Sequence, residues 1–152
     1  MDNKLIIKKS KLQDVFNLKD RLRKDDIEEL EALGSNPQTA LLRGYIYSEE
    51  CFSVFEGDKI IGMFGRSSFN MPVDICSIWF LGSDECLKHP VSFVKQGFKF
   101  INESLKIYRV IQNKVYAKNL SHIKWLKRLG VTFMQPQLIN GNEFIQFYKI
   151  RK

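Results

Sequence analysis

The chain has 152 residues, a length at which one domain can bury its own core without disulfides or structural metals. Hydrophobic residues make up 44% and charged residues 27%, which excludes an intrinsically disordered chain and favours a single domain over residues 1–152. The formal net charge is +7, but residues 88–128 hold ten Lys and Arg against one acid, Glu103, so this segment carries +9 and the rest −2.

The first third of the chain predicts one strand followed by helices. Residues 4–8 have the pattern of a short strand. Ser10, then Asp25 or Asp26, then Asn36 with its following proline are typical helix N-caps, and apolar residues recur behind each at helical spacing. We therefore expect helices over residues 10–22, 25–33 and 36–47.

The middle of the chain changes to the short apolar runs that strands show. Two such runs, 51–55 and 59–64, are joined by Glu56-Gly57-Asp58, which is typical of a tight hairpin. A third run covers residues 74–81. Together the three runs predict an antiparallel meander.

The last third alternates helices and strands. Helical spacing returns over residues 90–105 and again over 121–129, where Gly130 ends the helix. Asn140-Gly141 is a strong hairpin signal between two apolar runs. We therefore expect strands over residues 109–116, 131–134 and 144–150.

Membrane and metal-site signals are missing from the sequence. No apolar run approaches the ~18 residues that a membrane helix needs, and the first four residues lack the layout of a signal peptide. We expect a cytoplasmic protein with no membrane segment. Cys51, Cys76 and Cys86 match no metal-ribbon spacing, which predicts reduced thiols and no metal ligands.

The order of these elements, together with one motif, resembles the GCN5-related N-acetyltransferases (the GNAT superfamily). In that family an Asn after the fifth strand precedes a helix with an aromatic or aliphatic residue six positions later and a Gly eleven positions later. Asn119, Trp125 and Gly130 fit this pattern. The resemblance implies an α/β (α+β) fold with a mixed, mostly antiparallel central sheet of six to seven strands, flanked by helices, in which strands four and five splay apart.

Four segments in the same order resemble a family of short phage proteins. That family includes the internal virion protein of T7-like podophages, to which an acetyltransferase-like fold is assigned. The segments are residues 22–30, 61–65, 78–81 and 119–123, and the resemblance spans about residues 22–150. It implies a protein of the infected bacterial cytoplasm or of the virion.

The GNAT resemblance implies acetyl-CoA as the cofactor. Its pantetheine arm would pair with the backbone of the fourth strand, and its pyrophosphate would rest at the start of the following helix. An amide and two lysines of the last helix would complete the site. The implied residues are Trp79, Phe80, Leu81, Lys88, His89, Val91, Asn119, Lys124 and Lys127. Trp79, like Trp125, can alternatively be a core residue.

Two departures from the family pattern affect the expected chemistry. Residues 87–93 contain no glycine, whereas the family's phosphate loop uses glycines so that the backbone can approach the anion. Leu126 takes the position of the usual Tyr, the general acid for the leaving thiolate. Both departures favour weak cofactor binding or an inactive relative.

The expected base for an amine acceptor is Glu29, because the first helices form the acceptor side of this fold. Glu29 shares a helical face with Arg23 and Asp26, which we assign to the substrate. Asp26 can instead be a helix cap, and Arg23 with Glu29 a solvated ion pair. His122 is the second catalytic candidate, as an acid, a base or a contact to an anion, unless it is a surface or capping histidine.

Three functions are compatible with these residues. The first is transfer of acetyl from acetyl-CoA to an amine of unknown identity by direct attack. The second is a catalytically inactive phage assembly or virion protein, with other virion proteins as partners. The third is a nucleic-acid-binding protein, ranked lowest because most aromatic residues of segment 88–128 fall on predicted core positions. A monomer and a homodimer are both expected to be possible states.

Overall fold

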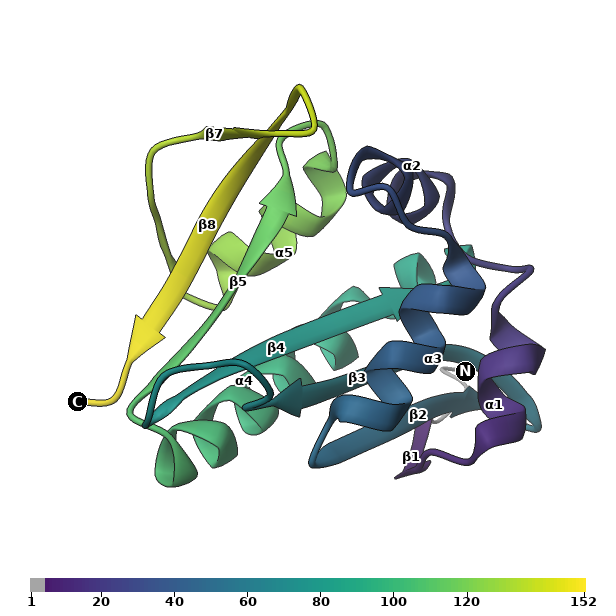
Figure 1. Cartoon of the computed structure of the whole chain (residues 1–152). Coiled ribbons are helices and arrows are strands. Elements are labelled where there is room, and N and C mark those ends of the chain that lie inside the picture. Colours follow the sequence, from purple (N-terminus) through teal and green to yellow (C-terminus); the bar gives the residue numbers. More distant parts are fainter. Residues whose placement is uncertain (1–4) are drawn as a thin grey trace.

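The computed structural model describes residues 5–152, so Lys4 of the predicted first strand lies outside the described residues. The first half contains β1 (Leu5–Lys9), α1 (Leu12–Leu18), α2 (Lys24–Ala32), α3 (Pro37–Tyr47), β2 (Glu50–Glu56) and β3 (Lys59–Ser67). The second half contains β4 (Ile75–Gly82), the 3-10 helix η1 (Asp84–Lys88), α4 (Pro90–Ile107), β5 (Val110–Tyr116), α5 (Leu120–Arg128), β6 (Thr132–Phe133), β7 (Gln137–Ile139) and β8 (Asn142–Ile150). This order confirms the predicted succession of helices and strands (Figure 1).

Two of the predicted helix N-caps are wrong. Ser10 lies two residues before α1, and its hydroxyl bonds to a hydroxyl of β2 instead. The N-cap of α2 is Arg23, and Asp26 lies inside this helix with a fully buried side chain. Asn36 caps α3 as predicted, since its Oδ1 accepts a hydrogen bond from the Thr39 amide at 2.9 Å.

All eight strands join one sheet in the order β1-β2-β3-β4-β5-β8-β6, and β7 also pairs with β8. Every pairing is antiparallel except that of β4 with β5. The sequence predicted six to seven strands, and the additional one is β7. It turns into β8 at Asn140 and Gly141, whose positive φ angles of 52° and 76° are those that this hairpin turn requires.

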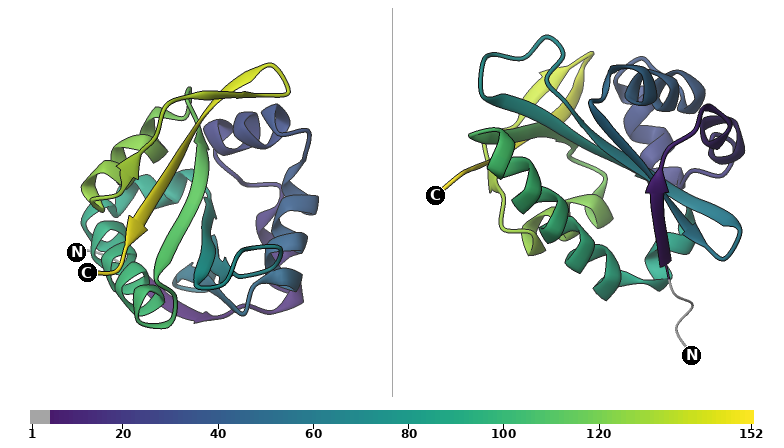
Figure 2. Two further views of the ribbon diagram at one scale, coloured as in Figure 1. Left: turned by 60° about the vertical axis from the view of Figure 1, so that its left-hand side comes forward. Right: turned by 90° about the horizontal axis from the view of Figure 1, so that it is seen from below.

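Helices cover both faces of the sheet (Figure 2). On one face α1, α2 and α3 pack over a core that includes Val15, Leu18, Leu41 and Met63. On the other face α4 and α5 pack over a core that includes Ile101, Ile111, Leu126 and Leu129. Because the sheet separates these two cores, a cavity that reaches both must pass between strands.

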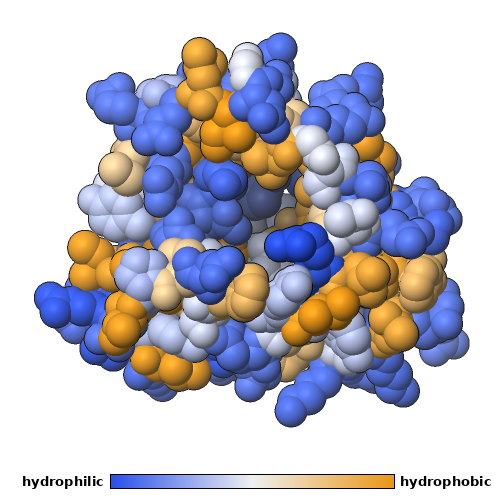
Figure 3. All heavy atoms as spheres, in the orientation of Figure 1, coloured by the Kyte–Doolittle hydropathy of each residue, from blue (hydrophilic) through white to orange (hydrophobic). Residues whose placement is uncertain are grey.

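The fourth and fifth strands diverge, as the sequence predicted. β4 and β5 pair only over their first residues, from Ile75 opposite Val110 to Ser77 opposite Gln112. Beyond that point β5 leaves β4 but stays paired with β8 along its whole length, so that β4 and β5 form a V (Figure 1). Asn113 stands at the apex, where its Nδ2 donates a hydrogen bond to the Ile78 carbonyl at 2.6 Å. The space-filling view shows the surface hollowed in the middle of this face (Figure 3).

Candidate active site

A cavity of about 210 Å³ passes through the gap between β4 and β5. Residues 79–81 of β4 and Asn113 of β5 line it at the level of the sheet. Gly44 of α3 lines it on one side of the sheet and Trp125 of α5 on the other. The cavity therefore crosses the sheet where the strands diverge. Its lining is largely apolar, so the few polar groups on its wall decide what chemistry it can support.

Glu29 is the carboxylate on the wall of this cavity. Its side chain is only 7% exposed, and its Oε1 accepts a hydrogen bond from the Tyr116 amide at 2.6 Å. Tyr116 is the last residue of β5, in the part of the strand that has left β4. Burial raises the pKa of Glu29 to about 7, against the opposing effect of the Tyr116 hydrogen bond. A carboxyl group with this pKa can act as a base near neutral pH.

His122 lies in the first turn of α5 and borders the same cavity. Burial lowers the pKa of its imidazole to about 4, so the ring is neutral at neutral pH. Its Nδ1 is buried and makes no hydrogen bond to any residue from 5 to 152. A neutral ring has one nitrogen that donates and one that accepts, which suits contact with a ligand better than proton donation as a cation.

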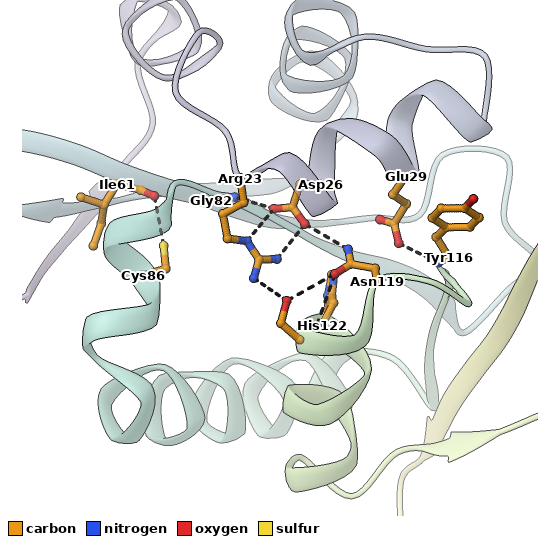
Figure 4. A network of polar contacts seen from close by, with 10 residues as sticks. Arg23, Asp26, Glu29, Ile61, Gly82, Cys86, Tyr116, Asn119 and His122 are labelled. Atoms are coloured by element: carbon orange, nitrogen blue, oxygen red, sulfur yellow. Dashed lines mark hydrogen bonds and ion pairs between the residues drawn. The ribbon is translucent and has the colours of Figure 1, made fainter.

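Arg23 and Asp26, the residues predicted to contact the substrate, form a buried ion pair (Figure 4). Arg23 Nη2 lies 2.7 Å from Asp26 Oδ1. The Asp26 carboxylate also accepts hydrogen bonds from the Gly82 amide at 3.2 Å and from Asn119 Nδ2 at 3.1 Å. Arg23 Nη1 donates to the Ser121 hydroxyl at 2.9 Å. This network ties the start of α2 to the end of β4 and the start of α5, and so holds the rim of the gap.

A second cavity, of about 290 Å³, lies between the start of α4 and one side of α5, from Ser121 to Arg128. Arg23, Lys124 and Arg128 supply positive charge on its wall. Pro90 and Phe93 place the first turn of α4 on its wall. The positive end of the α4 dipole and the nearby cations together make this cavity suitable for an anion.

The turn before α4 differs from the glycine loop of the resembled family. It contains η1, whose own hydrogen bonds engage the amides of Cys86 and His89. The predicted cofactor ligands of this turn line neither cavity: Lys88 and Val91 are exposed, and the His89 imidazole pairs with Glu56 of β2. Lys127 of α5 is likewise exposed and borders neither cavity.

The two tryptophans form walls of the gap. The Trp79 ring packs between Gly44 and Gly65, where an added Cβ would lie 2.5 Å and 2.9 Å from its atoms, and its Nε1 donates to Ser48 Oγ at 2.8 Å. Trp125 packs against Phe80, with ring centroids 5.5 Å apart.

Leu126 is 1% exposed and belongs to the core beneath α5. At this position the chain therefore offers no proton donor.

Cysteine chemistry does not contribute to the site. The Cys86 thiol borders the second cavity and donates to the Ile61 carbonyl at 3.1 Å, and burial raises its pKa to about 12. Burial also raises the pKa of Cys76, to about 11. Thiols with these pKa values stay protonated and are poor nucleophiles. Within residues 5–152 no three His, Cys, Asp or Glu side chains group as metal ligands, and no helix is long and apolar enough to span a membrane.

Several residues of the site were not found from the sequence. Gly82 and Tyr116 contribute through backbone amides, which no side-chain pattern can show. Ser121 and Arg128 are ordinary residues of an amphipathic helix until α5 is placed beside α4. Asn113 lies inside a predicted strand, and only the divergence of β4 and β5 explains its bond across the gap.

The fold is similar to that of solved acetyltransferases. Ribosomal-protein-S18-alanine N-acetyltransferase from Escherichia coli is similar over 98% of this chain and 95% of its own, with 12% identity and a TM-score of 0.69. AAC(6')-Ib, solved with ribostamycin and coenzyme A, is similar over 97% of this chain and 93% of its own, with 12% identity and a TM-score of 0.72. A GCN5-related N-acetyltransferase from Brucella melitensis is similar over 99% of this chain and 77% of its own, with 13% identity and a TM-score of 0.70. The chain therefore has the GNAT fold.

A sequence family adds a narrower similarity. The family described as "Bacteriophage T7, probable scaffold protein Gp13" matches residues 74–136, which is less than half of the chain. The match runs from the start of β4 to just beyond β6 and so includes both diverging strands. No curated protein sequence matches the chain.

Proposed function

We propose that the protein is an acetyl-CoA-dependent N-acyltransferase that transfers acetyl to an amine by direct attack. The observation that carries this proposal is the cavity through the β4–β5 gap with the Glu29 carboxyl on its wall. In support, AAC(6')-Ib, whose fold is similar, has been solved with coenzyme A and with acetyl-CoA.

The residues present fit such a cofactor. Residues 79–81 of β4 face the gap with a strand edge that β5 does not pair, so an extended arm can add there as a further strand. The second cavity, with Lys124 and Arg128, suits the pyrophosphate. His122 Nδ1, buried without a partner in the described chain, lies between the two places and can bond to the arm. When bound, acetyl-CoA would supply an acyl thioester.

Glu29 is the proposed base. An amine acceptor is mostly protonated at neutral pH and must lose a proton before it attacks. A carboxyl group whose pKa is about 7 is largely ionised just above that pH and can remove this proton. Leu126 has no proton to give and the His122 ring is neutral, so solvent is the proposed proton source for the departing sulfur.

Two measurements test the proposal. Calorimetry with acetyl-CoA is expected to show micromolar binding that weakens at least tenfold in the Lys124→Ala/Arg128→Ala variant. Thiol release with a panel of amines (a polyamine, a lysine peptide, an N-terminal peptide and an aminoglycoside) is expected to rise with pH through about 7. The absence of both binding heat and thermal stabilisation at millimolar acetyl-CoA would overturn the proposal.

A matched pair of variants tests the base. Glu29→Gln is expected to bind acetyl-CoA within twofold of the wild type but to lower transfer by ~10²-fold or more. The control is Glu28→Gln, which removes the same charge from an exposed position of the same helix. If the two variants transfer acetyl equally well, Glu29 is not the base.

The second candidate function is a catalytically inactive assembly or virion protein of a phage. The match of residues 74–136 to the T7 scaffold family favours it, as do the η1 turn in place of a glycine loop and the leucine at 126. On this proposal the protein acts in the infected cytoplasm or in the virion. Quantitative mass spectrometry of purified particles and precursors tests it: stoichiometric copies support the role, and complete absence from both contradicts it.

A further inference from the structure

The solvent side of α4 carries a line of lysines. Lys95, Lys99 and Lys106 are spaced by four and seven residues, which places them on one helical face. All three are exposed, while Phe100 and Ile101 of the same helix face the core. The line therefore lies on the side of α4 that points away from the sheet.

These lysines have no carboxylate partners. No Asp or Glu within residues 5–152 comes within 4.0 Å of Lys95, Lys99 or Lys106, although Lys59 and Lys19 elsewhere do form such pairs. One acid, Glu103, occurs on α4. Glu103 lies within one helical turn of Lys99 and Lys106 and forms no ion pair with them, so three lysines against one acid leave this side of α4 with a net positive charge.

The last helix extends the same surface. α4 and α5 lie side by side on one face of the sheet (Figure 2). Gly97 permits their close approach, since an added Cβ there would lie 3.0 Å from Leu129. Arg128 is exposed in the last turn of α5 and lines the second cavity together with residues of α4. We call Lys95, Lys99, Lys106 and Arg128 the α4–α5 basic face.

The aromatic residues near this face are not available for stacking on bases. Phe100 is buried, and Trp125 packs against Phe80 and Phe93. Phe98 is 38% exposed, but the Lys149 ammonium lies over its ring, 5.5 Å from the ring centroid. A single-stranded ligand needs exposed aromatic platforms, whereas a duplex backbone needs only an array of cations.

The length of the face also suits a duplex. Eleven residues separate Lys95 from Lys106, which is ~17 Å along a helix that rises ~1.5 Å per residue. A DNA duplex presents one phosphate charge per ~1.7 Å of its axis, so about ten phosphates lie within this span. We infer that the α4–α5 basic face binds the phosphate backbone of double-stranded nucleic acid without reading its sequence. This inference does not depend on the proposed acetyl transfer.

The experiment uses a fluorescently labelled 20-base-pair DNA duplex and the full chain, with anisotropy measured from 50 to 300 mM KCl. The test variant is Lys95→Gln/Lys99→Gln/Lys106→Gln. The control is Lys9→Gln/Lys11→Gln/Lys24→Gln, which removes the same charge from exposed positions away from the face. Circular dichroism melts check that both variants fold.

Wild-type binding is expected to weaken steeply with salt. The test variant is expected to lose at least tenfold in affinity at 50 mM KCl, and its slope of log affinity against log salt is expected to be shallower by about 2.7, or ~0.9 for each lost phosphate contact. The control is expected to stay within threefold of the wild type.

Three results would overturn the inference. They are no duplex binding by the wild type at 50 mM KCl, equal losses in the test and control variants, and binding of an acidic polyglutamate peptide without binding of the duplex. The last result would assign the face to an acidic protein partner.

Discussion

Replacing Glu29 by Gln should make the protein more stable at alkaline pH. The carboxyl is buried at the β4–β5 gap, and its pKa rises from 4.5 to about 7 because burial disfavours the charged form. Above pH 4.5 the unfolded chain releases this proton more readily than the folded protein does. The contribution of Glu29 to the free energy of unfolding is therefore fully present below pH 4.5 and is lost as the pH rises through 7.

The magnitude follows from the two pKa values. Their difference, 7 − 4.5, is about 2.5, and one pKa unit corresponds to about 1.4 kcal/mol. Linkage then gives a loss of about 1 kcal/mol at pH 5, about 2 at pH 6 and about 3 at pH 8. A glutamine at position 29 can still accept the Tyr116 amide hydrogen bond, and it carries no charge that burial could penalise.

Urea unfolding of wild type and Glu29→Gln from pH 5 to pH 8 measures this effect. The free energy of unfolding of the variant minus that of the wild type is expected to rise by about 2 kcal/mol across this range, because all other titrating groups cancel in the difference. Glu28→Gln, at an exposed position of the same helix, is expected to show no such rise. A pH-independent difference for Glu29→Gln would refute the reasoning.

Three further predictions concern stability and are read from urea or thermal unfolding. Asp26→Ala is expected to cost about 3 to 5 kcal/mol, because it leaves Arg23 charged and buried without its partner; a loss below 1 kcal/mol would contradict the network. As the pH falls from 6.5 through 4, the free energy of unfolding decreases because the folded pKa of His122 is about 4. His122→Asn should remove about 3 kcal/mol of this decrease. If the free energy of unfolding of the variant falls equally at acid pH, the ring is not buried and neutral. Gly44→Ala places a Cβ 2.5 Å from Trp79 and is expected to destabilise by about 1 to 3 kcal/mol, although alanine favours helices; equal or higher stability would show that the ring moves freely.

The sequence was informative about elements with strong local signals. The Asn140-Gly141 turn and the Asn36 cap depend on backbone preferences of a few residues, and the structure has both. The divergence of β4 and β5 was predicted from a resemblance to a fold, not from the residues of those strands. Local chemistry and whole-chain resemblance therefore predicted different parts of the molecule.

Asp26 shows where local reasoning failed. An Asp near a helix start is usually a cap, because its carboxylate can accept amide hydrogen bonds of the first turn. Here the carboxylate instead accepts from Gly82 and Asn119, which are 56 and 93 residues away along the chain. Such partners come together only after α2, β4 and α5 have packed around the gap.

The cofactor residues show the same limit. Lys88 and Lys124 are both lysines near predicted helix starts, and no sequence pattern distinguishes between them. The packing of α5 against α4 brings Lys124 to the wall of the second cavity, while η1 leaves Lys88 in solvent.

The sequence by itself determined the succession of strands and helices, because the spacing of apolar residues, helix caps and turn residues all depend on a few neighbouring residues. It also determined the excess of positive charge between residues 88 and 128, which is a property of composition. Tertiary structure decided that Glu29 is buried beside the gap and that the lysines of α4 share an open face. Burial, and with it the pKa of a carboxyl group, depends on residues distant in sequence, so it arises only when the chain has packed.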